Sequence, residues 1–295
     1  MMLISATQAS SVLGQLRAAT QANVSLDLGL TEATVSTAPG GVAFPDGTIV
    51  SQEDLRRVAA CDDTIFEVAG GAVSKLIRYS EATAKSYKLR PTADWPALEI
   101  SGILMHRIKG TTPRLDAEAK LRLVAPVLGS VLDTCMGLGY TAILAARTAA
   151  SVTAVEKDAN VIEMARINPH SRQLFHSPGE GGGLGAGSGG RRIRVIQGDA
   201  AEVLAGMPDG GFDLVNHDPP TLSVAGELYA DAFYAGLLRV LRPGGRLLHY
   251  IGSPGSRGRG VNLPASVSRR LGRLGFADVR HDQATGCVLA RKRGK

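Results

Sequence analysis

The chain lacks three features, each of which would assign it to a class of protein. Its three cysteines, Cys61, Cys135 and Cys287, are odd in number, far apart and without CxxC or Cys/His spacing, so they predict neither a disulfide framework nor a metal site. No run of about 18 apolar residues exists to span a bilayer. The start of the chain lacks the basic and apolar regions of a secretory signal. We therefore expect a cytoplasmic protein with no membrane partner and no bound metal.

The sequence divides into three parts by its texture. Residues 1–24 are small and polar and predict an N-terminal arm with a marginal helix. Residues 25–107 contain short strand-like runs separated by Gly-Gly and Pro-Asp-Gly turns, with one helix capped by Ser51, and predict a small α+β domain. Residues 108–295 alternate strand and helix patterns regularly and predict one larger α/β domain.

The alternation in the larger domain predicts a parallel sheet with helices on both faces. The expected strands are 131–133, 152–156, 193–196, 212–217 and 246–251, followed by a hairpin-like pair at the sheet edge, 276–280 and 286–290. Residues 178–190 are dense in glycine and lack the Gly-Lys-Ser/Thr ending of a phosphate loop. We expect them to form a flexible surface insertion without chemistry.

Four of the expected strands each deliver an acid to one edge of the sheet. Asp133 and Glu156 end the first two strands, and Asp199 and Asp218 follow the next two. Ligands of doubly wound sheets bind at the carboxyl ends of the strands. Clustered carboxylates repel one another and gain nothing from burial without donors, so packing does not readily explain four of them. The pattern predicts a ligand site at this edge.

The residues at this edge suit a nucleotide-like ligand. Gly137 and Gly139 lie in the turn after the first strand, where a missing Cβ lets the backbone approach a ligand, although tight packing alone also explains them. Glu156 follows Asp133 by 23 residues, close to the spacing at which an acid reaches the ribose hydroxyls of a bound nucleotide. Asp199 is placed to accept from an exocyclic amine such as adenine N6, to cap a helix, or both.

This set of residues resembles the class I S-adenosylmethionine-dependent methyltransferases. The matching motifs are Asp133-x-Cys135-x-Gly137-x-Gly139, Glu156 with Asp158, Gly198-Asp199, Asp218-Pro219-Pro220 and Leu241-Arg242-Pro243-Gly244-Gly245. With Met105-His106-Arg107 and His217, the chain is similar more closely to a family of predicted archaeal methyltransferases, sometimes labelled spermidine-synthase-like. The one departure is Cys135, which stands where the wider family usually has a glycine. We expect Cys135 to be a small buried residue rather than a reactive thiol.

The resemblance implies a fold and a cofactor. The fold is α/β, a Rossmann-like sheet of seven strands with the last one antiparallel, beside a small β-rich N-terminal domain. The cofactor is S-adenosyl-L-methionine, with Asp133, Gly137, Gly139, Glu156 and Asp199 at its site. Lys109, just upstream of the first strand, is a candidate for holding the methionine carboxylate, and a polar linker explains it equally well.

The resemblance also places the reaction at Asp218-Pro219-Pro220. In methyltransferases with Asn/Asp-Pro-Pro-aromatic, this segment accepts hydrogen bonds from a planar amino or amide nitrogen beside the donor methyl. Pro219 and Pro220 stiffen the loop. Thr221 replaces the aromatic residue, so a base-stacking platform is missing there. His217 is a candidate base near neutral pH or, alternatively, a hydrogen-bonded structural residue.

Three functions remain open. The first is methyl transfer to an amine or amide nitrogen in RNA, such as tRNA or rRNA, or in protein; the net charge of +6 and the basic run 291–295 favour RNA. The second is an aminopropyltransferase that uses decarboxylated S-adenosylmethionine. The third is a non-catalytic RNA-binding protein that retains the fold, which the presence of Glu156 and Asp218 disfavours. The sequence leaves the oligomeric state open, a homodimer included.

Overall fold

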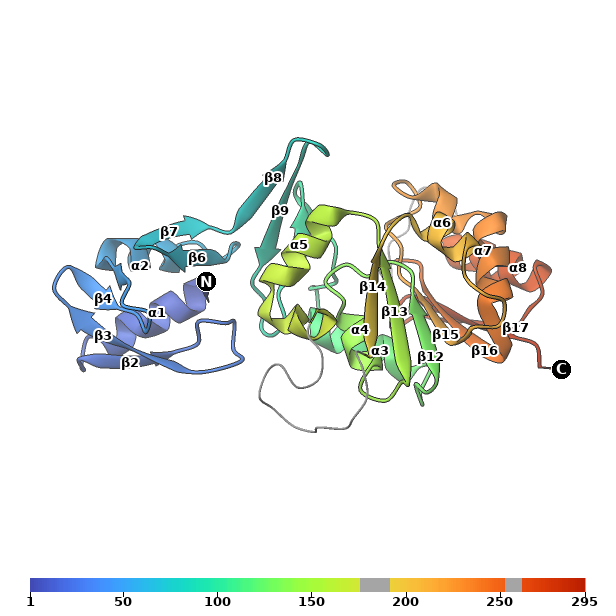
Figure 1. Ribbon diagram of the computed structural model, residues 1–295, viewed down its shortest axis with the longest axis horizontal. Coiled ribbons are helices and arrows are strands. Elements are labelled where there is room, and N and C mark those ends of the chain that lie inside the picture. Colours follow the sequence, from blue (N-terminus) through green and yellow to red (C-terminus); the bar gives the residue numbers. More distant parts are fainter. Residues whose placement is uncertain (176–191, 253–261, 295) are drawn as a thin grey trace. The chain divides into compact units, whose positions relative to one another are not determined.

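The computed structural model describes residues 1–175, 192–252 and 262–294 (Figure 1). The expected glycine-rich insertion at 178–190 lies outside the described residues. Contacts divide the chain into two compact units. The first unit comprises Met1–Pro113 and Ile167–His170, and the second comprises Arg114–Arg166 and Ser171–Lys295.

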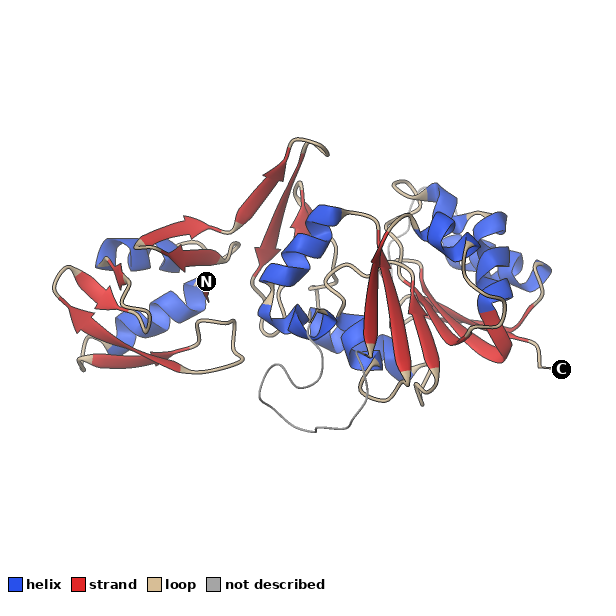
Figure 2. Cartoon of the chain, in the orientation of Figure 1, coloured by secondary structure: helices blue, strands red, loops and turns tan. Residues whose placement is uncertain are grey.

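The first unit is built from antiparallel strands and two helices (Figure 2). Its sheets have the orders β1-β6-β7, β2-β3-β4-β5 and β11-β10-β9-β8. The strands are β1 (Met2–Ile4), β2 (Gln21–Val24), β3 (Ala33–Ala38), β4 (Gly41–Ala43), β5 (Ile49–Val50), β6 (Phe66–Ala69), β7 (Ala72–Lys75), β8 (Ile77–Ser80), β9 (Lys85–Arg90), β10 (Ala97–Ile100) and β11 (Ile103–Leu104). The helices are α1 (Ala6–Gln15) and α2 (Gln52–Ala59).

Helix α2 begins directly after Ser51, the residue that the sequence predicted as its N-cap. The Ser51 hydroxyl accepts a hydrogen bond from the Asp54 amide at 3.0 Å. Acidic Glu53 and Asp54 lie in the first turn, where they interact favourably with the helix dipole. Leu55 and Val58 are buried, so the helix presents one apolar face to the core of the unit.

Residues 1–24 contain the helix that the sequence predicted, α1, but they pack into the first unit as β1, α1 and β2 and do not form a separate arm. Ile4 of β1 lies in register with Phe66 of β6. Ala9 and Val12 of α1 are fully buried in the same core as Val24. The apolar positions are few but lie on one helix face, which is enough to dock the segment. The first unit also ends at Pro113, where we expected a boundary after residue 107.

The second unit is the expected seven-stranded α/β sheet, with the order β14-β13-β12-β15-β16-β18-β17. Its first five strands in this order are parallel, and β18 runs antiparallel to both of its neighbours. The strands are β12 (Ser130–Asp133), β13 (Ser151–Glu156), β14 (Ile193–Gln197), β15 (Phe212–His217), β16 (Leu241–Tyr250), β17 (Phe276–Asp282) and β18 (Cys287–Lys292).

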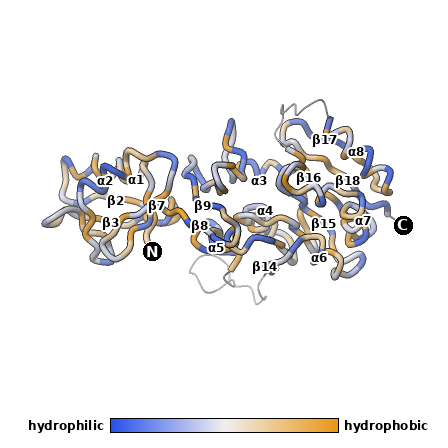
Figure 3. The backbone as a smooth tube through the Cα atoms, turned by 90° about the horizontal axis from the view of Figure 1, so that it is seen from above, coloured by the Kyte–Doolittle hydropathy of each residue, from blue (hydrophilic) through white to orange (hydrophobic). Residues whose placement is uncertain are grey.

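Helices cover both faces of this sheet (Figure 1). They are α3 (Pro113–Arg122), α4 (Tyr140–Ala145), α5 (Ala159–Ile167), α6 (Ala200–Ala205), α7 (Asp231–Val240) and α8 (Leu263–Arg273), with 3₁₀ turns η1 (Pro169–Leu174) and η2 (Gly226–Tyr229). Side chains of α6, α7 and α8 share one core with the strands, including Leu204, Leu237 and Leu271. Strands covered on both faces are apolar along their length. In β15 the buried apolar residues are Phe212, Leu214 and Val215, and Figure 3 shows hydrophobic and hydrophilic residues mixed along the elements of this unit.

The register of the central strands brings their carboxyl ends to one edge. Asp133 of β12 pairs with Ala154 of β13 and with Asn216 of β15. Glu156 and Asp218 therefore extend from the same edge as Asp133, as the sequence predicted.

One boundary differs from the sequence prediction. The strand expected at 246–251 begins earlier, at Leu241, so the motif Leu241 to Gly245 forms the first half of β16, with a register shift between Phe212 and Leu214 of β15. Among the described residues, no helix is both long and apolar enough to cross a membrane.

Candidate active site

The turn after β12 is joined to the end of β13. The Gly137 amide donates a hydrogen bond to Glu156 Oε2 at 2.9 Å, and the Asp158 amide donates to Glu156 Oε1 at 3.0 Å. Burial raises the pKa of the Glu156 carboxyl, and these two amides oppose the shift. Each oxygen keeps a further lone pair, so the carboxylate can still accept from the vicinal hydroxyls of a ribose.

The two glycines of the turn, Gly137 and Gly139, differ in what an added side chain would contact. Both have left-handed backbone angles, with φ +56° at Gly137 and +76° at Gly139. A Cβ on Gly139 would lie 2.4 Å from a methyl carbon of the buried Leu174, so packing alone requires glycine there. A Cβ on Gly137 would meet none of the described atoms within 4 Å. Open space beside the Glu156 carboxylate is what close approach of a ligand requires.

Asp133 supports the turn from inside the protein. Its side chain is buried, and Oδ2 accepts a hydrogen bond from the Thr141 hydroxyl at 2.6 Å. Burial raises the pKa of Asp133 to about 7. The Asn216 amide donates to the same hydroxyl at 3.3 Å, which extends the network to β15. The geometry therefore supports a bracing role for Asp133, and its contact with the cofactor stays a prediction.

Asp199 is the N-cap of α6. Its Oδ1 accepts from the Ala201 amide at 2.8 Å, and Oδ2 lies 2.9 Å from Lys157 Nζ. The hydrogen bond from Lys157 holds the pKa of Asp199 below its usual value. The capping role that the sequence offered is thus present, and contact with an adenine amine stays a prediction.

Asp218 forms an ion pair that the sequence did not reveal. Its Oδ2 lies 2.8 Å from Nζ of Lys120, a buried residue of α3 that also contacts Asp116 Oδ2 at 2.9 Å. The Asp218 side chain is 28% exposed, so it reaches the surface of the site. The Lys120 ammonium also lies 3.9 Å from the ring centroid of Tyr250, the last residue of β16.

Lys120 was missed because its sequence context is ordinary. Asp116 and Lys120 are spaced i,i+4 on a helix, a pattern that usually marks a solvated pair. The contact with Asp218 spans 98 residues of sequence. Tyr250 also supplies an aromatic ring to the site, whereas Thr221, which stands in the family's aromatic position, is exposed.

His217 is held in the core and does not face the site as a base. Its Nε2 donates to the Leu228 carbonyl at 3.0 Å, which requires Nδ1 to accept from the Thr134 hydroxyl at 2.7 Å. Burial lowers the pKa of His217 well below its ordinary value, and neighbouring His249 adds to the shift. Both ring nitrogens are occupied by the Thr134 hydroxyl and the Leu228 carbonyl, and burial disfavours the charged imidazolium, so the catalytic assignment of His217 gives way to the structural one.

The loop after β15 is held in place by a tyrosine of η2. The Tyr229 hydroxyl donates to the Pro220 carbonyl at 3.0 Å, and Pro219 is buried while Pro220 is exposed. Tyr229 packs beside His217, with ring centroids 6.4 Å apart. The loop that carries Asp218 is therefore stiffened by its prolines and anchored by a tyrosine.

Two further predicted residues have simple placements. Cys135 is half-buried, and burial beside Glu156 and Asp133 raises its thiol pKa well above the usual value, so the thiol stays protonated. Lys109 belongs to the first unit, and its contact with a methionine carboxylate stays a prediction.

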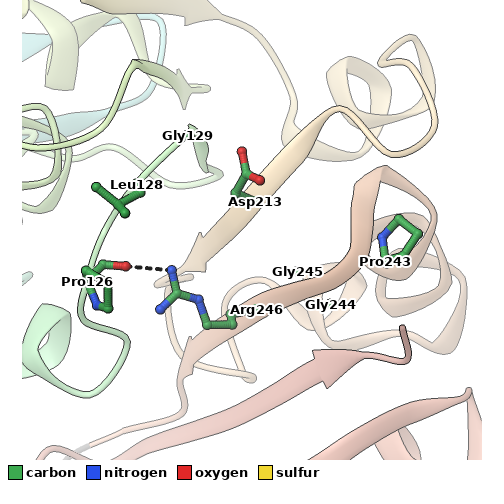
Figure 4. A pocket seen from close by; sticks show the side chains of 8 residues that line it. All are labelled: Pro126, Leu128, Gly129, Asp213, Pro243, Gly244, Gly245 and Arg246. Carbon is green, nitrogen blue, oxygen red and sulfur yellow. Dashed lines mark hydrogen bonds between the residues drawn. The ribbon is translucent and has the colours of Figure 1, made fainter. Parts of the chain in front are cut away.

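A cavity at the opposite edge of the sheet is not part of this site (Figure 4). Arg246 donates to the Pro126 carbonyl at 2.7 Å there, and Asp213 accepts from the Ser130 amide at 2.7 Å. These residues lie at the amino ends of the strands, where ligands of such sheets do not bind.

Known proteins match the fold and the site region. A family described as methyltransferase domain matches residues 132–249. An uncharacterized protein of Methanocaldococcus jannaschii is 43% identical over 252 residues, which is 85% of this chain and 81% of that protein. The chain belongs to the same family as the Methanocaldococcus jannaschii protein, and its second unit carries a class I methyltransferase domain. This is the family resemblance that the strand-end acids and glycines indicated.

Aminopropyltransferases are also similar to this chain, one in sequence over about half of the chain and two solved spermidine synthases in fold. Polyamine aminopropyltransferase 2 of Streptomyces coelicolor is 32% identical over 162 residues, 52% of this chain and 27% of that protein. The spermidine synthase of Thermotoga maritima has a TM-score of 0.54 at 17% identity and covers 78% of this chain and 79% of its own. A spermidine synthase in complex with a transition-state analogue has a TM-score of 0.55 at 16% identity. At these identities the two structures show a shared fold for this methyltransferase-family chain.

Proposed function

We propose that this chain transfers a methyl group from S-adenosylmethionine to an amine or amide nitrogen, with RNA as the favoured acceptor and protein as the alternative. One observation carries the proposal. Three adjacent parallel strands each deliver one acid to the same edge of the sheet. Strand β13 ends in Glu156 beside the open turn at Gly137, β12 ends in the buried Asp133, and the stiffened loop after β15 carries the partly exposed Asp218.

The described residues fit the donor. Glu156 offers carboxylate oxygens at the end of β13, and Gly137 leaves space in front of its backbone. Asp133 and Thr141 hold the turn in place, so the site is formed before a ligand binds. These groups suit a ribose and its attached chain.

Asp218 is suited to orient the acceptor. When bound, S-adenosylmethionine supplies a sulfonium methyl group: the acceptor nitrogen forms a bond to the methyl carbon, the carbon–sulfur bond breaks, and its electron pair stays on sulfur. The Asp218 carboxylate accepts the nitrogen's N–H hydrogen bond, which directs the lone pair towards the methyl carbon. It then accepts the proton that the methylated nitrogen releases, and its exposed side returns that proton to solvent.

The basic composition supports RNA as the acceptor. The formal net charge is +6, and the basic run 291–295 starts with Arg291 and Lys292, the last two residues of β18. Lysine and arginine side chains that contact phosphates release counterions and give RNA affinity that falls with salt.

Aminopropyl transfer is the second candidate. It is supported by the 32% identity with a polyamine aminopropyltransferase over 162 residues. The two reactions differ in the donor, because the methyl donor carries a carboxylate and the aminopropyl donor does not.

Calorimetric titration of S-adenosylhomocysteine and of decarboxylated S-adenosylmethionine into the full chain tests the proposal. We expect S-adenosylhomocysteine to bind more tightly by at least about tenfold, or about 1.4 kcal/mol. A clear preference for the decarboxylated compound would overturn methyl transfer and favour the second candidate. The acceptor is then identified by comparing modified nucleosides and modified proteins in cells with and without the gene.

A further inference from the structure

The buried ammonium of Lys120 has a role that methyl transfer does not by itself require. Only 5% of the residue is exposed. Its Nζ lies 2.9 Å from Asp116 Oδ2 and 2.8 Å from Asp218 Oδ2, and it faces the ring of Tyr250. Two carboxylates and an aromatic face are the groups that bind an ammonium ion, so this side chain fills an ammonium site that the fold itself has built.

Lys120 keeps its charge in this position. Burial lowers the pKa of the ammonium, but the carboxylates of Asp218 and Asp116 outweigh burial and raise it above the ordinary value. A buried salt bridge contributes little net stability compared with apolar packing. The cluster is therefore poorly explained as a device for holding the fold together.

The ion pair limits what Asp218 can do. Within the described part of the chain, Lys120 is the one residue that hydrogen bonds to the Asp218 carboxylate, and it occupies Oδ2. The oxygen Oδ1 remains for the acceptor. An acceptor with a neutral N–H group can donate to Oδ1 without competing for the charge of the carboxylate. An incoming ammonium would compete with the Lys120 ammonium for the same carboxylate and would bind more weakly than at a site without Lys120.

We propose that Lys120 determines the acceptor class of the site: it selects an uncharged nitrogen, such as an amide or an aromatic amine, and rejects the ammonium groups of polyamines. This inference rests on the proposed methyl transfer and specifies its substrate. Lys120 acts through Asp218 and is a specificity-determining residue, not a group that takes part in bond making.

Binding of spermidine to the chain saturated with S-adenosylhomocysteine tests the inference, because it requires no knowledge of the natural acceptor. We compare the wild type with Lys120→Met, which removes the charge and keeps most of the volume. The matched control is Lys88→Met in the first unit, because Lys88 also bridges two acids, Asp63 Oδ2 at 2.9 Å and Glu99 Oε1 at 3.2 Å. Thermal melting establishes that each variant is folded.

We expect Lys120→Met to bind spermidine at least about tenfold more tightly than the wild type, and Lys88→Met to stay within about threefold of it. Lys120→Arg keeps the charge and is expected to reject spermidine as the wild type does. If Lys120→Met does not fold, Lys120→Gln carries the same expectation. Spermidine affinity in the wild type equal to or above that of the charge-removing variant would overturn the inference.

The outcome is separable from that of the proposed function. A preference for the decarboxylated donor, together with continued rejection of spermidine, would refute methyl transfer but would still show that Lys120 excludes ammonium groups from the site. A preference for S-adenosylhomocysteine, together with tight spermidine binding by the wild type, would refute Lys120 as the selecting residue and leave methyl transfer intact.

Discussion

At the amino-terminal edge of the sheet, Asp213 accepts from the Ser130 amide and from Arg242, each at 2.7 Å. A Cβ on neighbouring Gly129 would lie 2.0 Å from the Asp213 carboxylate, so the space left by that glycine is already filled. At the carboxyl-terminal edge, Glu156 accepts only backbone amides from its described neighbours, and the space before Gly137 is open. The space beside a glycine and an acid is thus filled by the acid at one edge and left open at the other, and only the open edge has room for a ligand.

Both edges have a glycine with positive φ next to an acid, so the residue types alone do not separate them. A paired and filled site is complete without a ligand. Acids whose burial raises their pKa carry an energetic cost, and such acids concentrate at functional sites.

The largest expected effect is on transfer by Asp218→Ala. Losing the carboxylate that orients the nitrogen and accepts its proton should lower kcat by at least about 100-fold. Affinity for S-adenosylhomocysteine should stay within about tenfold of the wild type, because Asp218 faces the acceptor. The measurement is transfer of labelled methyl to total RNA, together with calorimetry. Full transfer by the variant would exclude Asp218 from the reaction.

Asp213→Ala provides the contrasting result at the other edge. Removing the partner of the Ser130 amide and Arg242 should cost about 1–2 kcal/mol of unfolding free energy, measured by urea denaturation. The variant should keep the wild-type affinity for S-adenosylhomocysteine. A loss of affinity with unchanged stability would reverse the roles that we assign to the two edges.

A smaller effect concerns the pH dependence of stability. The folded pKa of Asp133, about 7, lies above its unfolded value, so its contribution to stability is full at low pH and is lost as pH rises through about 7. The stability difference between the wild type and Asp133→Asn should therefore move against the wild type between about pH 4 and pH 7. Urea denaturation across this range measures it; a constant difference would show that Asp133 titrates normally.

The sequence predicted the sheet and the residues at its carboxyl edge because these depend on local patterns. Strand ends, glycine turns and an acid after each strand are visible within short segments, and the strand register then brings Asp133, Glu156 and Asp218 to one edge. Ser51 as the cap of α2 was predictable for the same reason.

The remaining features depend on contacts between distant residues. The sequence did not separate Gly137 from Gly139, because only the packing of Leu174 against Gly139 distinguishes them. The sequence allowed His217 to be either a catalytic base or a structural residue. Its contacts with Thr134 and Leu228, which occupy both ring nitrogens, favour the structural role. Lys120 carried no local signal, since its pairing with Asp218 requires α3 to pack against the end of β15.

The most direct test of the account is titration of S-adenosylhomocysteine into the wild type, Glu156→Ala and Asp213→Ala. If the carboxyl edge binds the donor ribose, Glu156→Ala should weaken binding by at least about tenfold, because a charged acceptor of two hydroxyl hydrogen bonds is lost. Asp213→Ala should bind as the wild type does. Unchanged affinity in folded Glu156→Ala would contradict the assignment of the donor to this edge.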